Sequence, residues 1–356
     1  MKINTFTKYI LLLTALLVWT SQLRSQQFSE PDSTSLDYLL QKHFSGKFGF
    51  SILIATNNQI IFKEAYGYTD TLKTKKIYQE KLFNIASISK SFTAIAIFRL
   101  VEQGEIKLSD TIGKFIDNVP ADKRSIAIHH LFSHTSGFEQ NYVCDGLTNS
   151  QEALAALLQD TLTFIPGSSF SYSNQNFEML ALIIEKITSI KYENFVRREI
   201  LEPLKMRVTY FWNEVNDKNS IAGKSEVIPD SLTKRNWGYI GSGGIYSTPI
   251  DLYKFWQAVI DHELISKSNT EKLFRNYYQT SSGIKVGYGW FVNDTTAWHS
   301  SEIWTRGSES WGHNAVIRWF PAKKTVIIVC TNSGEMGDKQ TTGNRIISNY
   351  IADFLW

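Results

Sequence analysis

Ser87 and Lys90 are the residues of this chain whose types and spacing are best suited to covalent chemistry. They open a segment with an apolar face at helical spacing, which predicts a helix from Ser87 to about Gln103 that Gly104 ends. Residues three positions apart are neighbours on a helix surface, so the lysine would lie beside the serine hydroxyl, near the free N–H groups of the first turn. The apolar face consists of Phe92, Ile95, Ala96, Leu100 and Val101.

A serine hydroxyl becomes an effective nucleophile when a neighbouring base removes its proton. A lysine serves as that base when burial or another cation favours its neutral form, and Ser–Lys pairs are a known variant of the Ser–His arrangement. The pair therefore predicts acyl transfer with Ser87 as the nucleophile and Lys90 as the base. The competing interpretation is a plain helix N-cap with Lys90 in solvent, because the same spacing recurs at Ser231 and Ser282 without a long helix after it.

A second polar group, Tyr172 and Asn174, lies just before a predicted helix at 175–189 and after a turn at Pro166-Gly167. A tyrosine can relay a proton, and an asparagine can orient Lys90 or a substrate amide. The competing interpretation of Tyr172 is a loop residue packed on the core.

A third group, Arg306 with Gly307, Ser308 and Glu309, lies before a predicted pair of strands. A cation here would hold a substrate carboxylate and favour the neutral form of a neighbouring base. The small residues would let a substrate backbone lie along the strand edge. The competing interpretation is an exposed polar loop.

The composition supports a large globular domain of two parts or two domains. The chain has 356 residues, 43% of them apolar, and a formal net charge of +3 without a long basic run, so nucleic acid is not an expected partner. Cys144 and Cys330 are the only cysteines; they do not make a disulfide framework, although they could pair in an exported protein. Cys330 is expected to be a buried thiol in a strand. No Cys/His spacing resembles a metal site, and no cofactor is expected.

The N-terminus reads as a secretory signal over residues 1–25. Lys2 and Lys8 precede an apolar run from Ile10 to Trp19, which is shorter than the roughly 20 residues that span a bilayer. The expected location is therefore outside the cytoplasm, in the periplasm or the extracellular space. The alternative is an uncleaved anchor, which would be the only membrane contact.

The order of predicted elements is strands, a long helical middle, strands and a final helix. This order favours an α/β fold of the α+β type, in which an antiparallel sheet flanked by the terminal helices carries a separate helical lobe. Residues 26–356 would form one domain, with a sheet lobe at about 35–80 and 284–356 and a helical lobe at about 87–280. A cleft between lobes is a usual place for a small-molecule site. Helices are expected near 35–44, 87–103, 151–159, 175–189, 192–200, 250–261, 267–275 and 344–356, and strands near 48–55, 59–66, 286–292, 315–320 and 325–331.

From about Phe48 to Asn332 the chain resembles the serine β-lactamase and penicillin-binding-protein-like superfamily, and most closely its branch of class C β-lactamases, D-Ala-D-Ala carboxypeptidases and related esterases. The family's nucleophile segment is matched by residues 83–94, its "HLLTHTSG" segment by residues 126–138, its Tyr-x-Asn element by residues 172–174, and its "GGLYSTAEDL" segment by residues 243–252. The resemblance implies a β-lactamase/transpeptidase-like fold and an oxyanion hole formed by the Ser87 N–H and a second N–H at about Glu309.

The third motif departs from the family pattern, which is usually Lys-Thr-Gly or His-x-Gly. Counting back without gaps from Pro321 places Arg306-Gly307-Ser308 there, and a shift of one residue gives Thr305-Arg306-Gly307. Neither alignment has lysine or histidine in first place. The glutamate that activates the deacylating water in class A β-lactamases has no evident counterpart.

The resulting hypothesis is an exported serine hydrolase that forms an acyl-enzyme on Ser87 and acts on a peptide amide, an ester or a β-lactam-like carbonyl of a small-molecule or peptide substrate. Tyr172 would assist Lys90, Asn174 would orient the substrate, and Arg306 would bind a carboxylate or support the charge network. The alternative is a catalytically degenerate binding protein of the same fold that holds a peptidoglycan-like or other small ligand. The oligomeric state does not follow from the sequence.

Overall fold

The computed structural model describes residues 33–70, 72–215, 234–309, 312–334 and 342–356. The signal sequence expected at residues 1–25 lies outside this part of the chain. Within it, no helix has the length and apolar character needed to cross a bilayer, and no cluster of three or more His, Cys, Asp or Glu side chains has the arrangement of a metal site.

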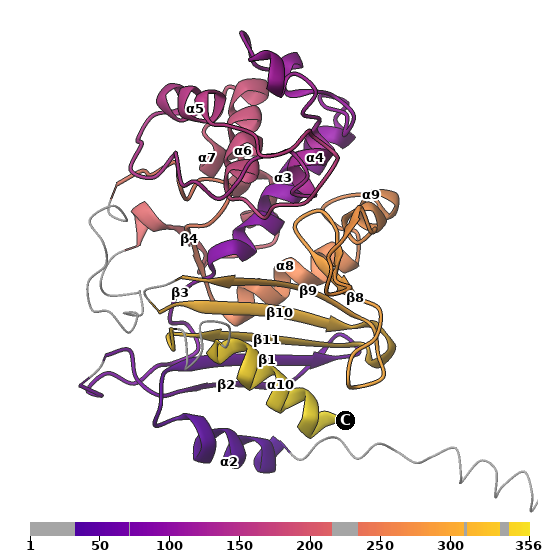
Figure 1. The fold of residues 1–356 in the computed structure, drawn as a ribbon. Helices are drawn as coiled ribbons and strands as arrows, with labels where there is room; N and C mark the ends of the chain where they lie inside the picture. Colours follow the sequence, from indigo (N-terminus) through magenta and orange to yellow (C-terminus); the bar gives the residue numbers. More distant parts are fainter. Residues whose placement is uncertain (1–32, 71, 216–233, 310–311, 335–341) are drawn as a thin grey trace, which may run out of the picture.

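An antiparallel sheet forms the base of the molecule, in the order β2-β1-β11-β10-β9-β8-β7-β6 (Figure 1). Segments from both ends of the chain are neighbours in this sheet, because β1 pairs with β11 from Phe50–Thr331 to Thr56–Thr325. This confirms the predicted fold class. The strands are β1 (Phe50–Thr56), β2 (Gln59–Tyr66), β6 (Tyr278–Gln279), β7 (Lys285–Val286), β8 (Phe291–Asn293), β9 (Glu302–Ser308), β10 (Asn314–Phe320) and β11 (Thr325–Thr331).

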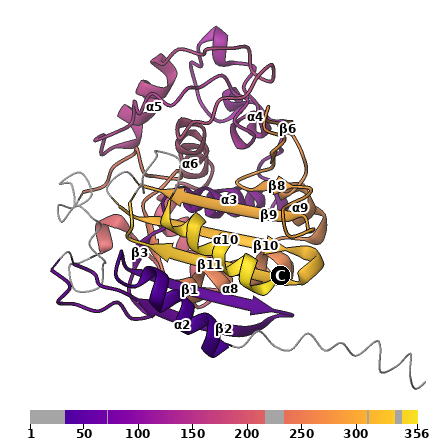
Figure 2. The ribbon, with the colours of Figure 1, turned by 60° about the horizontal axis from the view of Figure 1, so that its bottom comes forward.

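The two terminal helices, α2 (Ser33–Phe44) and α10 (Gly343–Leu355), cover one face of this sheet, which we call the outer face (Figure 2). Their apolar sides pack with alternate residues of the central strands, among them Phe50, Ile327 and Val329. The opposite, inner face is covered by α8 (Pro249–Ile260), which contacts β1 and β11. Because both faces are covered, every residue of β11 is buried.

The remaining helices form the lobe beside the inner face, and α3 runs through its centre (Figure 1). Nearly all of α3 is buried, and its Phe92 ring stacks on Phe255 of α8 with 3.9 Å between ring centroids. The lobe and the sheet therefore share one core. The helices are α3 (Ser89–Glu102), α4 (Ile128–Phe132), α5 (Ser150–Gln159), α6 (Gln175–Thr188), α7 (Tyr192–Val196) and α9 (Lys267–Leu273); a small second sheet contains β3 (Phe83–Asn84), β5 (Ile245–Ser247) and β4 (Tyr210–Phe211) in that order.

Three local predictions differ from the structure. Residues 250–260, expected in the helical lobe, pack on the sheet as α8. The ring centroids of Trp256 in α8 and Trp319 in β10 are 5.7 Å apart. The strand expected at 286–292 is two short strands, because Gly287 and Gly289 lie between them and Gly289 has a φ of +75°. Residues 302–308 form a strand, β9, where the residues alone left a polar loop open.

Both cysteines are buried, and neither is in a disulfide. Cys144 lies in the core of the helical lobe, and Cys330 lies in β11, as predicted for a structural thiol.

Phe92→Ala should lower the free energy of unfolding by about 3–5 kcal/mol, because it leaves a cavity between α3 and α8. Urea denaturation measures this loss. Leu72→Ala is the control, since Leu72 is 80% exposed and its truncation should change stability by less than about 0.5 kcal/mol. Equal effects of the two substitutions would contradict the shared core.

Candidate active site

Ser87 lies in a short 3₁₀ turn, Ala86–Ile88, between β3 and α3. Ala86 has a φ of +46°, in the left-handed region that alanine rarely adopts, and its N–H donates to Asn84 Oδ1 at 2.7 Å. Ala86 and Ile88 are buried, whereas Ser87 is partly exposed. The turn therefore projects the Ser87 side chain out of an otherwise buried segment, and the α-helix begins two residues later than predicted.

Lys90 is 3% exposed, and its Nζ lies 3.1 Å from Ser87 Oγ. The same Nζ lies 2.7 Å from Asn174 Oδ1 and 2.7 Å from the Ser242 carbonyl oxygen. Lys90 Nζ is thus within hydrogen-bond distance of three oxygens, and one of them is the Ser87 hydroxyl. The geometry suits a lysine that accepts the serine proton.

Tyr172 also contacts the nucleophile, and its Oη donates to Ser87 Oγ at 2.9 Å. Its ring stacks on His134, with 4.5 Å between ring centroids. The Ser173 N–H donates to His134 Nδ1 at 3.2 Å. Burial, and then the charge of Lys90, lower the pKa of His134 to about 3, so the imidazole is neutral at physiological pH and supports Tyr172 as an aromatic plate.

The strand β9 runs beside the nucleophile turn, and Gly307 is the point of closest approach. A Cβ atom at this position would lie 2.1 Å from the Ile85 carbonyl oxygen and 2.6 Å from the Ser87 nitrogen. Only glycine permits this approach without displacement of the backbone.

The approach of Gly307 decides which residues form the third motif. Side chains alternate across a strand, so Thr305 and Gly307 face the inner side, opposite Ile317 and Ala315 of β10. The alignment that places glycine against the nucleophile is therefore Thr305-Arg306-Gly307, and the ungapped alignment Arg306-Gly307-Ser308 is wrong by one residue. The place that is lysine or histidine in the usual family pattern holds Thr305, whose hydroxyl is 3.2 Å from Ser91 Oγ.

Arg306 belongs to the outer side of β9, opposite Val316. Its guanidinium lies over the Trp304 ring, 5.5 Å from the centroid, and it also borders the cavity at Ser87. The cation is therefore at the rim of the site rather than on the same face as Gly307.

The predicted oxyanion donor at Glu309 needs correction. The Glu309 N–H donates to the His313 carbonyl oxygen at 2.8 Å, across the ladder to β10. Backbone groups of adjacent strand residues point to opposite edges, so the Ser308 N–H points away from β10. On that edge β8 pairs with β9 only from Glu302 to Trp304. The Ser308 N–H, next to Gly307, is thus the donor placed to act with the Ser87 N–H on a carbonyl oxygen.

A cavity with about 280 Å³ of empty volume lies at Ser87. Polar walls come from Lys90, His134, Tyr172 and Thr305, and the facing wall is the β7–β8 hairpin with its two glycines. The reacting group of a substrate would therefore meet Ser87 between these polar side chains and the hairpin.

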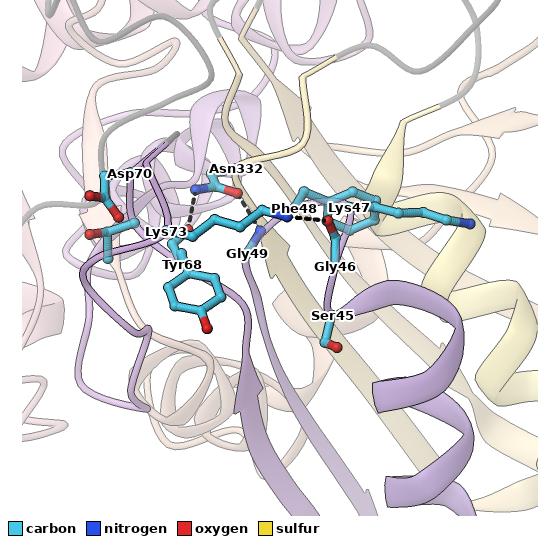
Figure 3. A pocket seen from close by; sticks show the side chains of 10 residues that line it. Ser45, Gly46, Lys47, Phe48, Gly49, Tyr68, Asp70, Lys73 and Asn332 are labelled. Carbon is cyan, nitrogen blue, oxygen red and sulfur yellow. Dashed lines mark hydrogen bonds between the residues drawn. The ribbon is translucent and has the colours of Figure 1, made fainter.

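A separate pocket lies where α2, β1 and β2 meet (Figure 3). The Lys73 side chain crosses it and donates to the Gly46 carbonyl oxygen at 3.2 Å, while the Asn332 amide bridges the Gly49 N–H and the Tyr68 carbonyl oxygen. None of its lining residues lines the cavity at Ser87. These contacts tie chain segments together, and we assign the pocket to structure.

The structure thus brings Ser87, Lys90, Tyr172 and Asn174 into one hydrogen-bonded group, as the sequence predicted for their positions. Sequence reasoning singled out neither His134 nor Ser242 as a site residue. His134 begins the His-Thr-Ser-Gly turn and Ser242 precedes Gly243-Gly244, and both segments resemble family motifs. Their place in these motifs is the sequence feature that could have indicated a role in the site.

The comparison with protein families matches residues 40–349 to a model described as Beta-lactamase. The chain belongs to the beta-lactamase family. Penicillin-binding protein 4* of Bacillus subtilis is 27% identical over 324 residues, which are 83% of this chain and 70% of that protein. Other curated relatives are matched over only 37% of their length.

Solved structures of similar fold agree with this assignment. The octameric penicillin-binding protein homologue from Pyrococcus abyssi has a TM-score of 0.77 at 25% identity, covering 91% of this chain and 77% of its own. A D-amino acid amidase from Ochrobactrum anthropi has a TM-score of 0.76 at 19% identity, covering 90% of this chain and 98% of its own, and shows the shared fold. The family contains serine hydrolases, which is the coarse functional class predicted from the motifs.

Gly307→Ala should slow acylation of Ser87 by at least about tenfold and lower stability by about 1–3 kcal/mol, because the new methyl group displaces β9 from the nucleophile turn. The rate of covalent labelling by a fluorophosphonate and urea denaturation measure the two effects. Gly46→Ala is the control, since a Cβ there meets nothing within 4 Å. Unchanged labelling in Gly307→Ala would contradict the assigned contact.

A buried acid lies one helical turn beyond Asn174. Glu178 is 1% exposed, and its Oε2 has no hydrogen-bond partner among the described residues. Burial raises the pKa of Glu178 from 4.5 to about 8, and the nearby Asp145 adds to the rise while the Cys144 hydrogen bond and Lys90 oppose it. The carboxyl group is therefore mostly protonated at neutral pH.

Glu178→Gln should gain stability relative to the wild type as the pH rises from 5 to 8. Between about 4.5 and 8 the folded wild type holds a proton that the unfolded chain releases, so the wild type loses stability with rising pH. The glutamine variant lacks this loss, and the difference should reach the order of a few kcal/mol near pH 8. Urea denaturation of both proteins at several pH values tests this, and parallel stability curves would show that Glu178 is ionised in the folded state.

Proposed function

We propose that this protein is an exported serine hydrolase that forms an acyl-enzyme on Ser87. The observation that carries the proposal is the position of Ser87 Oγ between two proton-transferring groups, Lys90 Nζ at 3.1 Å and Tyr172 Oη at 2.9 Å. A serine used only as a helix cap would have no need of a buried lysine and a tyrosine at its oxygen.

The reaction follows from these contacts. Ser87 Oγ attacks the substrate carbonyl carbon while its proton passes to Lys90, and the carbonyl oxygen takes up negative charge between the Ser87 and Ser308 N–H groups. The proton then passes, directly or through Tyr172, to the leaving nitrogen or oxygen, and the bond to that atom breaks. Water attacks the resulting ester, gives a proton to the same base, and Ser87 regains its hydrogen as the acid leaves.

The substrate class is an amide or ester, and we rank peptidase or esterase activity above efficient β-lactam breakdown. The support is Thr305, because a neutral side chain on the inner face supplies no charge for a carboxylate, and the cation Arg306 borders the site only at its rim. D-amino-acid amides and peptides belong to the substrate screen, since an amidase and penicillin-binding proteins share the fold.

The proposal of export rests on the basic, then apolar, N-terminal sequence alone. A location in the periplasm or outside the cell would bring the site to peptides and esters of the cell envelope.

The second candidate function is a binding protein on the same fold, which holds a ligand without turning it over. Thr305 is the observation that favours it, because the first position of the third motif, usually lysine or histidine in the family, holds a threonine here. In that case Ser87 would not be activated.

Labelling of the purified protein by a fluorophosphonate, followed by intact mass, tests the two functions. We expect one adduct on the wild type, none on Ser87→Ala, and labelling slowed by about 10²-fold or more in Lys90→Ala, because the base is lost. Ser282→Ala is the matched control, since Ser282 also precedes a lysine by three residues but is exposed and starts no helix. A folded wild type without an adduct would overturn the hydrolase and favour the binding protein.

A further inference from the structure

A larger cavity lies on the outer face of the sheet, between β8–β10 and the start of α10. Its empty volume is about 880 Å³, against about 280 Å³ at Ser87. The two cavities share one residue, Arg306. The outer cavity is therefore distinct from the acyl-transfer site and meets it only at this side chain.

The one acidic side chain that lines the outer cavity is already neutralised. Glu302 is 5% exposed, and its Oε1 accepts from Arg318 Nε at 2.5 Å. Its Oε2 accepts from Asn293 Nδ2 at 3.2 Å. Arg318 is satisfied as well, because its Nη1 donates to Ser348 Oγ and Asn349 Oδ1.

Two further arginines line the cavity without such partners. Among the described residues, neither Arg306 nor Arg345 forms an ion pair with a carboxylate. Burial, and then the charge of Arg345, lower the pKa of Arg306, so the two guanidinium groups lie close enough to interact. Two like charges in one cavity repel each other, and an anion bound between them would offset this repulsion.

The start of α10 adds to this positive potential. Arg345 is the third residue of the helix and is exposed, and the first turn contains no acidic residue. An arginine at the positive end of a helix dipole is unfavourable for the helix itself. The arrangement is explained if an anion binds there.

An aromatic surface lies beside the arginines. The Trp304 ring lies under the Arg306 guanidinium, and Trp304 Nε1 is buried without a hydrogen-bond partner among the described residues. Phe291 stacks on the same ring with 4.6 Å between centroids, so a flat ligand would pack against the part of Trp304 that stays exposed.

We propose that the outer cavity is an accessory binding site for a small ligand with a carboxylate or phosphate group, held between Arg306 and Arg345 with its uncharged part over Trp304. Guanidinium groups bind both kinds of oxyanion through paired N–H donors. The site does not depend on Ser87 chemistry, so it stands or falls separately from the proposed function.

Isothermal titration of the Ser87→Ala protein with inorganic phosphate, and separately with succinate, tests the site at low ionic strength, where screening is weak. We expect saturable binding of at least one probe with a Kd of about 1 mM or tighter, weakened by about tenfold or more in Arg345→Gln. The stronger probe identifies the preferred group, phosphate or carboxylate.

Arg207→Gln is the matched control, because Arg207 is exposed, lies in the helical lobe and lines neither cavity. Arg345→Lys keeps the charge without the paired donors and should bind with intermediate strength, which separates loss of binding from loss of fold. Absence of saturable binding by both probes, or equal weakening in Arg345→Gln and Arg207→Gln, would overturn the proposal.

Discussion

The contact between Gly307 and the nucleophile turn is the constraint on which the rest of the site depends. It brings the backbone of β9 against the Ser87 nitrogen, at a distance that leaves no room for a side chain. Because β9 belongs to the sheet and Ser87 leads into α3, this contact fixes the position of the sheet relative to the helical lobe. Two backbone N–H groups can then face one oxygen, which an isolated helix start would not provide.

Burial determines which groups near Ser87 carry charge. Desolvation lowers the pKa of His134 to about 3 and raises the pKa of Glu178 to about 8, so both are mainly neutral near pH 7. The direct partners of Lys90 besides Ser87 are the oxygens of Asn174 and Ser242, which are also uncharged. These two neutral acceptors fix the position of Lys90 Nζ beside the Ser87 hydroxyl.

Long amphipathic or apolar patterns made much of the fold predictable from the sequence. The patterns that predicted α3, α6, β10 and β11 each extend over six or more residues, and the structure contains all four elements. The same patterns placed Ser87 and Lys90 on one helix start and Tyr172 before another. These predictions rested on periodicity, which local sequence contains.

The parts of the structure that the sequence did not predict depend on contacts between distant segments of the chain. The Thr305–Ser308 segment of β9 mixes polar residues with glycine and has no apolar alternation of its own, because one side meets the nucleophile turn and the other meets a polar cavity. The sequence left two alignments of the third motif open, one residue apart, and in a strand such a shift moves every side chain to the other face. Only the position of Gly307 against Ser87 reveals the register.

The register of β9 determines which cavity Arg306 faces. With Arg306 in the middle place of the motif, the cation of β9 faces outward, beside Arg345 and over Trp304, while the inward place holds the neutral Thr305. The single strand β9 separates two cavities with different electrostatics. In the inner cavity a buried lysine can act as a base, and the outer cavity has an excess of positive charge. Because Arg306 faces outward and Thr305 faces inward, the inner cavity attracts carboxylates less strongly and the proposed anion site lies on the outer face. The alternation of side chains along β9 accounts for both properties.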